Sequence, residues 1–136
     1  EGPAGLAKGL GLLDVDTVLA GDKTLSLVSA ESVAYQTPVR GYEIHMGVST
    51  GAGRDRPFLS IDGAGEGAMS ADGRVIGSYC HGLFASNQFR TAFLAGFGVA
   101  TDALDYDGQV DAVLDRLAGH MATHLHLDAL SKIAGI

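Results

Sequence analysis

A histidine at the end of an apolar segment is the first residue whose surroundings favour chemistry. His81 stands in the phrase GSYCHGLF, residues 77–84, after Val75, Ile76 and other residues typical of a β-strand. Gly82 then lets the backbone turn. Active sites of α/β sheets gather at the carboxyl ends of strands, and the ordinary pKa of histidine suits a general base. We therefore predict that His81 is a catalytic base; the alternative is a polar residue that only ends a strand.

The single cysteine of the sequence, Cys80, directly precedes His81. Neighbouring residues of a strand point to opposite faces of a sheet, so this thiol and this imidazole cannot meet. We interpret Cys80 as a small buried residue. A cysteine nucleophile that works with His81 then has to come from elsewhere. One cysteine also excludes an internal disulfide and a zinc site made of cysteines, and it favours the cytoplasm.

A second segment with chemical potential is RGYEIHMG, residues 40–47. Strand alternation places Glu43 and His45 on one face, a carboxylate and an imidazole two residues apart. The other face is apolar and carries Tyr42, Ile44 and Met46. This pair is a candidate for shaping a substrate or ammonia path, and the alternative is a solvated strand face with a fortuitous pair.

Strands are expected over most of the first part of the chain. Apolar clusters or alternation predict strands at 12–20, 23–30, 39–46, 57–61 and 74–80. Turns are expected at Gly21-Asp22 and Asp72-Gly73, and Gly-rich turns at 51–53 and 63–67.

Helices are expected after Phe84. Ser86 or Asn87 can cap a helix that ends at Gly96 and Gly98, with an apolar face of Phe89, Phe93, Leu94 and Phe97. A longer helix after Asp107 has an apolar stripe: Val110, Val113, Leu114, Leu117, Met121 and Leu125. Residues 127–136 are expected to form a short terminal helix that docks or frays. Strands followed by helices indicate part of an α/β or α+β domain, and with no linker we expect one domain over 1–136.

Composition narrows the function classes. The formal net charge is −7, and the nine Lys and Arg residues are scattered, which argues against nucleic acid and anionic membranes as partners. The sequence has no apolar run of about 18 residues. Residues 1–20 have no basic start followed by an apolar stretch, so we expect no secretory signal. The Gly-rich opening, residues 1–11, lacks the pattern of a phosphate loop and is expected to be a flexible loop. Because the sequence starts at Glu1, we expect a fragment or a processed product.

Four blocks in series carry a family resemblance: GLGLLDVDT, VRGYEIHMG, DGRVIGSYCHGLF and the closing LDAL. Together they resemble the later part of the C-terminal glutamine amidotransferase domain of the cobyric acid synthase family. The resemblance covers nearly the whole chain. It implies an α/β, flavodoxin-like class I amidotransferase fold, with a strand-rich first part and C-terminal helices.

The resemblance also implies a mechanism. In this family a cysteine on a strand–helix elbow attacks the amide of glutamine, and a histidine that matches His81 activates the thiol. The elbow lies upstream of the GLGLLD block, so we expect residues 1–136 alone to be inactive. In the broader class a glutamate two residues after the histidine orients it; here that position is Leu83. What orients His81 stays open.

The implied partners follow from the whole enzyme. Glutamine is the nitrogen donor, and a corrinoid is amidated in an ATP- and Mg-dependent synthetase domain that these residues do not contain. We expect no cofactor or metal in residues 1–136, although His120 and His124, at helical spacing, could hold zinc. An incomplete sheet also leads us to expect self-association. The alternatives are a related amidotransferase, such as cobyrinic acid a,c-diamide synthase or a cell-wall amidating enzyme, and a non-catalytic scaffold.

Overall fold

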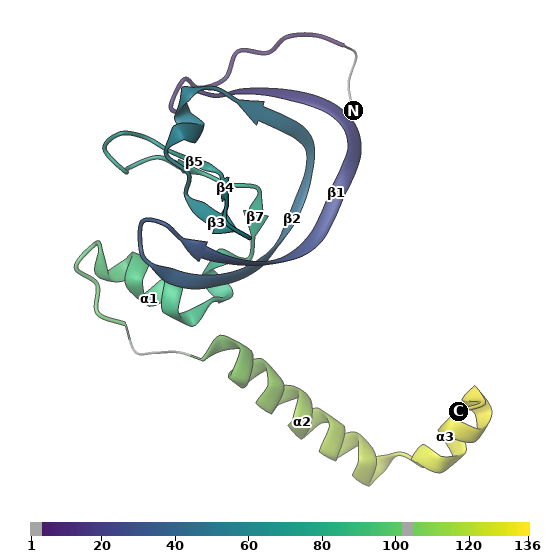
Figure 1. The fold of residues 1–136 in the computed structure, drawn as a ribbon. Coiled ribbons are helices and arrows are strands. Elements are labelled where there is room, and N and C mark those ends of the chain that lie inside the picture. Colours follow the sequence, from purple (N-terminus) through teal and green to yellow (C-terminus); the bar gives the residue numbers. More distant parts are fainter. Residues whose placement is uncertain (1–3, 102–104) are drawn as a thin grey trace. The chain divides into compact units, whose positions relative to one another are not determined.

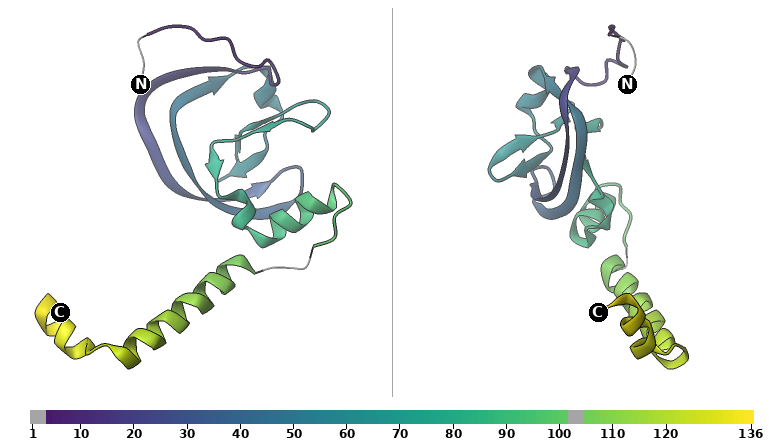
Figure 2. Two further views of the ribbon diagram at one scale, coloured as in Figure 1. Left: turned by 180° about the vertical axis from the view of Figure 1, so that it is seen from behind. Right: turned by 90° about the vertical axis from the view of Figure 1, so that its right-hand side faces the viewer.

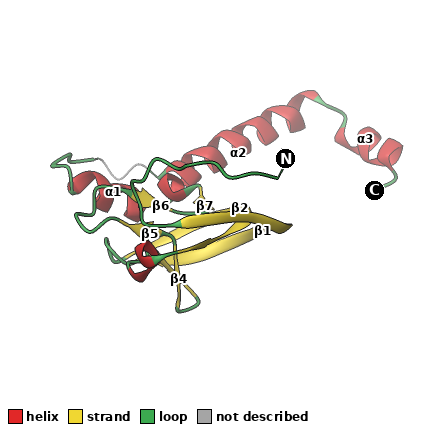
Figure 3. Ribbon diagram, turned by 90° about the horizontal axis from the view of Figure 1, so that it is seen from above, coloured by secondary structure: helices red, strands yellow, loops and turns green. Residues whose placement is uncertain are grey.

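The computed structural model describes residues 4–101 and 105–136, and its contacts divide the chain into two compact units. The first unit is Glu1–Ala103 and holds every strand found among the described residues; the second is Leu104–Ile136, and its described part is helical. Figure 3 shows this change from strands to helices along the chain, as the sequence predicted. The expectation of one domain over 1–136 stays a prediction. Part of the Gly-rich opening, residues 1–3, lies outside the described residues; residues 4–15 form no helix or strand.

A long antiparallel hairpin dominates the first unit. Strand β1, Asp16–Ser32, turns back into β2, Thr37–Thr50, and the pair curves around the smaller strands (Figures 1 and 2). The sheet has the order β4-β3-β1-β2-β7, and all of its pairings are antiparallel. Its short members are β3 (Leu59–Ile61), β4 (Ala64–Glu66) and β7 (Cys80–His81). A separate ribbon joins β5 (Ala68–Met69) to β6 (Ile76–Gly77).

The expected turn at Gly21-Asp22 is wrong. The structure has a β-bulge there: Leu19 pairs with Gly47 and Thr24 with His45, so residues 20–23 stand opposite Met46. Gly21 takes a φ of +85°, a conformation that glycine adopts without strain. From Asp16 on, the two expected strands form the single strand β1, because β2 offers one partner along its length; residues 12–15 of the first expected strand lie outside it.

The expected turn at 63–67 is also wrong in its position. The chain reverses at Asp62 and Gly63, both with positive φ, and the following residues form β4, which pairs with β3. Glycine-rich composition obscured this strand, because glycine carries no side chain that reveals an alternation. The turn at Asp72-Gly73 is confirmed: Gly73 N–H donates to the Ser70 carbonyl, and Gly73 has a φ of +70°.

The predicted strand at 74–80 is interrupted. Only Ile76–Gly77 and Cys80–His81 form ladders, and Ser78 and Tyr79 lie between them. Both intervening residues donate hydrogen bonds to the Glu66 carboxylate, from Ser78 Oγ at 2.8 Å and from Tyr79 N at 2.7 Å. These bonds divert the backbone from one ladder to the other.

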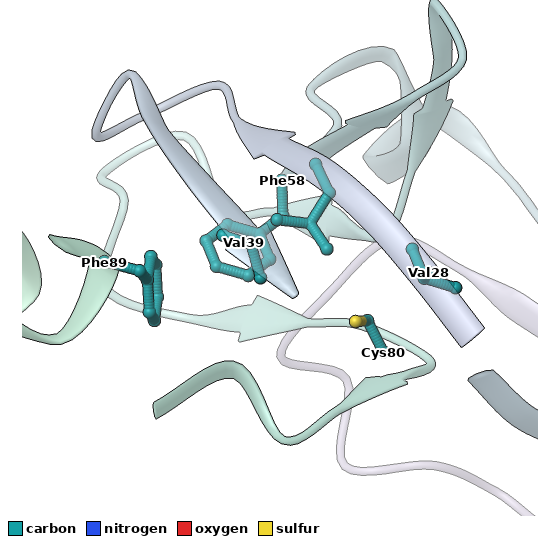
Figure 4. Close-up of a cluster of buried hydrophobic side chains, with 6 residues drawn as sticks. Val28, Val39, Phe58, Cys80 and Phe89 are labelled. Carbon is teal, nitrogen blue, oxygen red and sulfur yellow. The ribbon is translucent and has the colours of Figure 1, made fainter. Parts of the chain in front are cut away.

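The core lies between the hairpin and the first helix. The buried cluster contains Val28, Val39, Phe58, Leu59, Cys80 and Phe89, and Figure 4 shows five of them labelled. Helix α1, Asn87–Ala95, supplies Phe89, which packs edge-to-face on Phe58 with ring centroids 5.9 Å apart. The sequence predicted this helix and its end at Gly96; of the two expected caps, Ser86 or Asn87, Ser86 stands at the N-cap position but its side chain makes no capping hydrogen bond. Ser86 Oγ bonds the Arg40 backbone instead of the helix, and so ties α1 to β2.

The described part of the second unit, residues 105–136, contains two helices. Helix α2, Tyr106–His124, begins at Tyr106 although the helix was expected only after Asp107, because the Asp105 side chain accepts a hydrogen bond from Gly108 N at 3.1 Å and caps it. Helix α3, Leu127–Ala134, is the expected terminal helix. Within the described residues, no helix is both long and apolar enough to span a membrane.

Candidate active site around His81

Strand β7 decides the direction of the His81 side chain. In its ladder with β2, His81 pairs with Tyr42 and Cys80 pairs with Glu43. Paired residues of an antiparallel ladder share a face of the sheet, and neighbours along a strand do not. His81 and Tyr42 therefore lie on one face, and Cys80 and Glu43 lie on the other.

The His81 ring is exposed and lies against Tyr42. The two ring centroids are 5.3 Å apart and the planes differ by 8°, a stacked arrangement. Gly82 follows in the left-handed conformation at φ +80°, which turns the chain into the 3-10 helix Leu83–Ala85. None of the hydrogen bonds between described residues involves the His81 ring.

The face that carries His81 is apolar and open. We call it the apolar face; the register of β1 and β2 assigns to it Val18, Leu25, Leu27, Tyr42 and Val48, all of them exposed. Leu27, which pairs with Tyr42, is 92% exposed. Such a patch of large apolar side chains is typical of a surface that another protein segment covers.

The opposite face carries Glu43 and His45 beside a cavity of about 340 Å³. The His45 ring stacks on Tyr79, with centroids 4.2 Å apart, and His45 Nδ1 lies 2.9 Å from the Gly47 carbonyl oxygen. The Tyr79 hydroxyl continues the network to Ser49 Oγ at 2.7 Å. The cavity is thus lined by a fixed imidazole and a fixed phenol.

A buried carboxylate closes one side of this cavity. Glu66 is 8% exposed and its oxygens accept the hydrogen bonds from Ser78 and Tyr79 described above. Arg54 lies at the rim and donates to the Ser49 carbonyl oxygen at 2.8 Å. Sequence reasoning missed Glu66 because it lies within a stretch interpreted as a turn, and it missed Tyr79 because only the fold brings it to His45.

Cys80 is unsuited to nucleophilic attack. Its side chain is 5% exposed within the core (Figure 4). Burial first, and then the charges of Glu66 and Glu43, raise the pKa of its thiol to about 11. A thiol of this kind is almost entirely protonated near neutral pH. The interpretation of Cys80 as a small buried residue is confirmed.

The structure does not bring the three candidate residues together. His81 lies on the apolar face, whereas Glu43 and His45 lie on the face with the cavity. Leu83 packs against the core from its 3-10 helix. In the helical unit, the His120 and His124 rings are 4.4 Å apart, but no three ligand side chains among the described residues could share a metal ion.

Comparison of the sequence with known proteins identifies the family to which the chain belongs. Residues 1–89 match the family described as the CobB/CobQ-like glutamine amidotransferase domain. The match covers more than half of the chain and includes His81, Glu43 and His45. The chain therefore belongs to this family of glutamine amidotransferase domains, which agrees with the expected class I amidotransferase fold.

Individual relatives are more specific than the family. The chain is 52% identical over 134 residues to the cobyric acid synthase of Rhodobacter capsulatus, covering 98% of the chain and 28% of that protein. It is 50% identical over 134 residues to that of Cereibacter sphaeroides, with the same shares of each chain. It is 49% identical over 137 residues to that of Caulobacter sp., covering all of the chain and 28% of that protein. The chain thus spans just over a quarter of the length of these relatives. No solved structure matches it.

Proposed function

We propose that residues 1–136 are the later part of a single glutamine amidotransferase domain of a cobyric acid synthase. The domain frees ammonia from glutamine for the ATP- and Mg-dependent amidation of corrinoid side-chain carboxylates in cobalamin biosynthesis. ATP and Mg are used in a synthetase domain outside these residues, and the enzyme works in the cytoplasm. The observation that carries the proposal is His81, which β7 presents on an open face within a chain about half identical to cobyric acid synthases.

His81 acts as the base in this proposal. Its imidazole takes the proton of a cysteine thiol, and the thiolate attacks the side-chain carbonyl of glutamine. The imidazolium then protonates the departing ammonia, and water hydrolyses the thioester to glutamate. The thiol comes from outside residues 1–136, because Cys80 is buried on the other side of β7. It reaches His81 from the apolar face.

Glu43 and His45 shape the path of ammonia in this proposal. They lie on the face opposite His81, which favours the ammonia path over direct contact with the amide under attack. The Gly47 carbonyl is an acceptor, so a neutral His45 carries its proton on Nδ1 and has Nε2 as an acceptor for an N–H group. The nearby cavity has room for several small molecules the size of ammonia.

The nitrogen source tests the proposal. The longest polypeptide that the gene encodes is assayed for corrinoid amidation with glutamine and, separately, with ammonium salts. We expect His81→Asn to abolish the glutamine-dependent reaction and to leave the ammonia-dependent reaction intact. Unchanged glutamine-dependent amidation in this variant contradicts the role of His81.

In the isolated 136-residue chain, we further propose that a second copy covers the apolar face. Among the described residues, β1 has no partner but β2 from Asp16 to Ala30, so its outer edge can accept another strand. The exposed apolar side chains around Leu27 are then buried between the two copies. Light scattering should report a dimer or larger species that Leu27→Asp dissociates, while Leu6→Asp, at an exposed position outside the strands, does not. A monomeric parent chain contradicts this proposal.

A further inference from the structure

The exposed His81 ring needs something to hold it in one orientation. A general base must keep its nitrogen aligned with the thiol, and a misplacement of about 1 Å can cost roughly 100-fold in rate. The position that carries an orienting glutamate in other amidotransferases is Leu83, which is packed against the core. Among the residues that the structure describes, no side chain hydrogen-bonds the His81 ring.

Tyr42 is the side chain that meets this ring. The ladder places the two residues directly opposite each other, and the rings stack at 5.3 Å with an 8° angle between their planes. This separation lies within the range of favourable aromatic pairs. The imidazole can slide within this parallel, offset contact, whereas a tilt would break the parallel stack.

The turn after His81 also adjoins Tyr42. A Cβ atom at Gly82 would lie 3.7 Å from the Cε1 atom of the Tyr42 ring, so the phenol adjoins both the imidazole and the reversal that follows it. Since β7 is only two residues long, its ladder alone constrains the His81 side chain little. The contact with Tyr42 therefore supplies the remaining constraint.

We propose that Tyr42 is the positioning residue for His81, and that it acts through the face of its ring. Stacking takes the place of the hydrogen bond from a carboxylate that orients the histidine elsewhere in this class. It leaves both imidazole nitrogens open, one for the thiol and one for solvent. This inference rests on the proposed role of His81 as the base.

The shape of the side chain at position 42 provides the test. Tyr42→Phe keeps the ring and removes the hydroxyl, whereas Tyr42→Leu keeps an apolar side chain and removes the ring. Tyr106→Leu, at an exposed tyrosine of the helical unit, is the control. In the longest polypeptide that the gene encodes, each variant is assayed for glutamine hydrolysis and for ammonia-dependent amidation.

We expect Tyr42→Leu to lower kcat/KM for glutamine by about 3- to 10-fold, the value of one aromatic pair. The fall should lie in kcat rather than in KM, and the ammonia-dependent rate should not change. Tyr42→Phe should rescue the glutamine reaction. Equal losses in the Phe and Leu variants would overturn the inference, because the hydroxyl and not the ring face would then matter.

A second measurement does not depend on activity. Stacking shifts the His81 ring protons upfield, and their signals can be assigned by their loss in His81→Asn. The shift should persist in Tyr42→Phe and disappear in Tyr42→Leu. If His81→Asn abolishes glutamine hydrolysis while Tyr42→Leu changes neither the rate nor the shift, the inference is wrong and the proposed function stands. If His81→Asn remains active, the proposed function itself fails.

Discussion

Gly41 is the position where one methyl group should disturb the candidate site most. A Cβ atom there would overlap the carbonyl oxygen of His81 and lie 2.8 Å from the Cys80 sulfur. The carbonyl oxygen would have to move by about 1 Å before the contact became tolerable. Strand β7 is held to β2 by two residue pairs, so it is the element that yields.

The expected cost of Gly41→Ala has two parts. Overpacking of this kind destabilises a fold by about 1–3 kcal/mol. A displacement of His81 by about 1 Å lowers glutamine hydrolysis by roughly 100-fold. Gly119→Ala is the matched control, because a Cβ atom at Gly119 meets nothing within 4 Å. Gly119 also lies in helix α2, where alanine is favoured over glycine by up to about 1 kcal/mol.

Two assays measure these effects. Urea unfolding gives the free energy of unfolding, and glutamate release from glutamine gives kcat/KM in the longest encoded polypeptide. Gly41→Ala should reduce both quantities, and Gly119→Ala should reduce neither. Wild-type stability together with wild-type glutamine hydrolysis in Gly41→Ala would refute the close packing of β7 against Gly41.

Three further predictions concern the fold. Because the folded state raises the pKa of Cys80 to about 11, the protonated thiol contributes fully to stability below about pH 8.5, and this contribution is lost as the pH rises toward 11. Cys80→Ala should therefore make the free energy of unfolding less dependent on pH over that range. Hydrogen bonds from Ser70 Oγ and then Arg74 N hold the pKa of Asp72 below 3.8, so the ionised carboxylate contributes fully to stability above pH 3.8 and this contribution fades at lower pH. Ser70→Ala should raise the pKa of Asp72 in an NMR titration. Phe58→Ala, at a fully buried ring, should cost about 3–5 kcal/mol in the free energy of unfolding.

Local patterns predicted the elements that carry the site. The alternation in residues 39–46 gave strand β2 and its two faces, and the caps and glycines around residues 86–98 gave helix α1. Alternation along a strand also predicted that Cys80 and His81 point to opposite faces of the sheet, and the structure confirms this. The sequence also carried the family resemblance, which the comparisons confirm.

Pairing could not be predicted in the same way. Whether Gly21-Asp22 makes a turn or a bulge depends on which strand lies opposite, and that partner is distant in sequence. The contact between Tyr42 and His81 depends on the register of β7, and the bonds from Ser78 and Tyr79 to Glu66 depend on a further reversal of the chain. The separation of His81 from Glu43 and His45 is a consequence of that register, which no single segment contains.

The central claim is that His81 is the base of a glutaminase whose nucleophile is not Cys80. Glutamate release from glutamine by the longest encoded polypeptide, compared between Cys80→Ala and His81→Asn, tests it most directly. We predict that Cys80→Ala stays within about twofold of the wild-type kcat/KM and that His81→Asn loses at least about 100-fold, as expected for a general base. Loss of glutamate release in Cys80→Ala with correct folding, or its persistence in His81→Asn, would contradict the account.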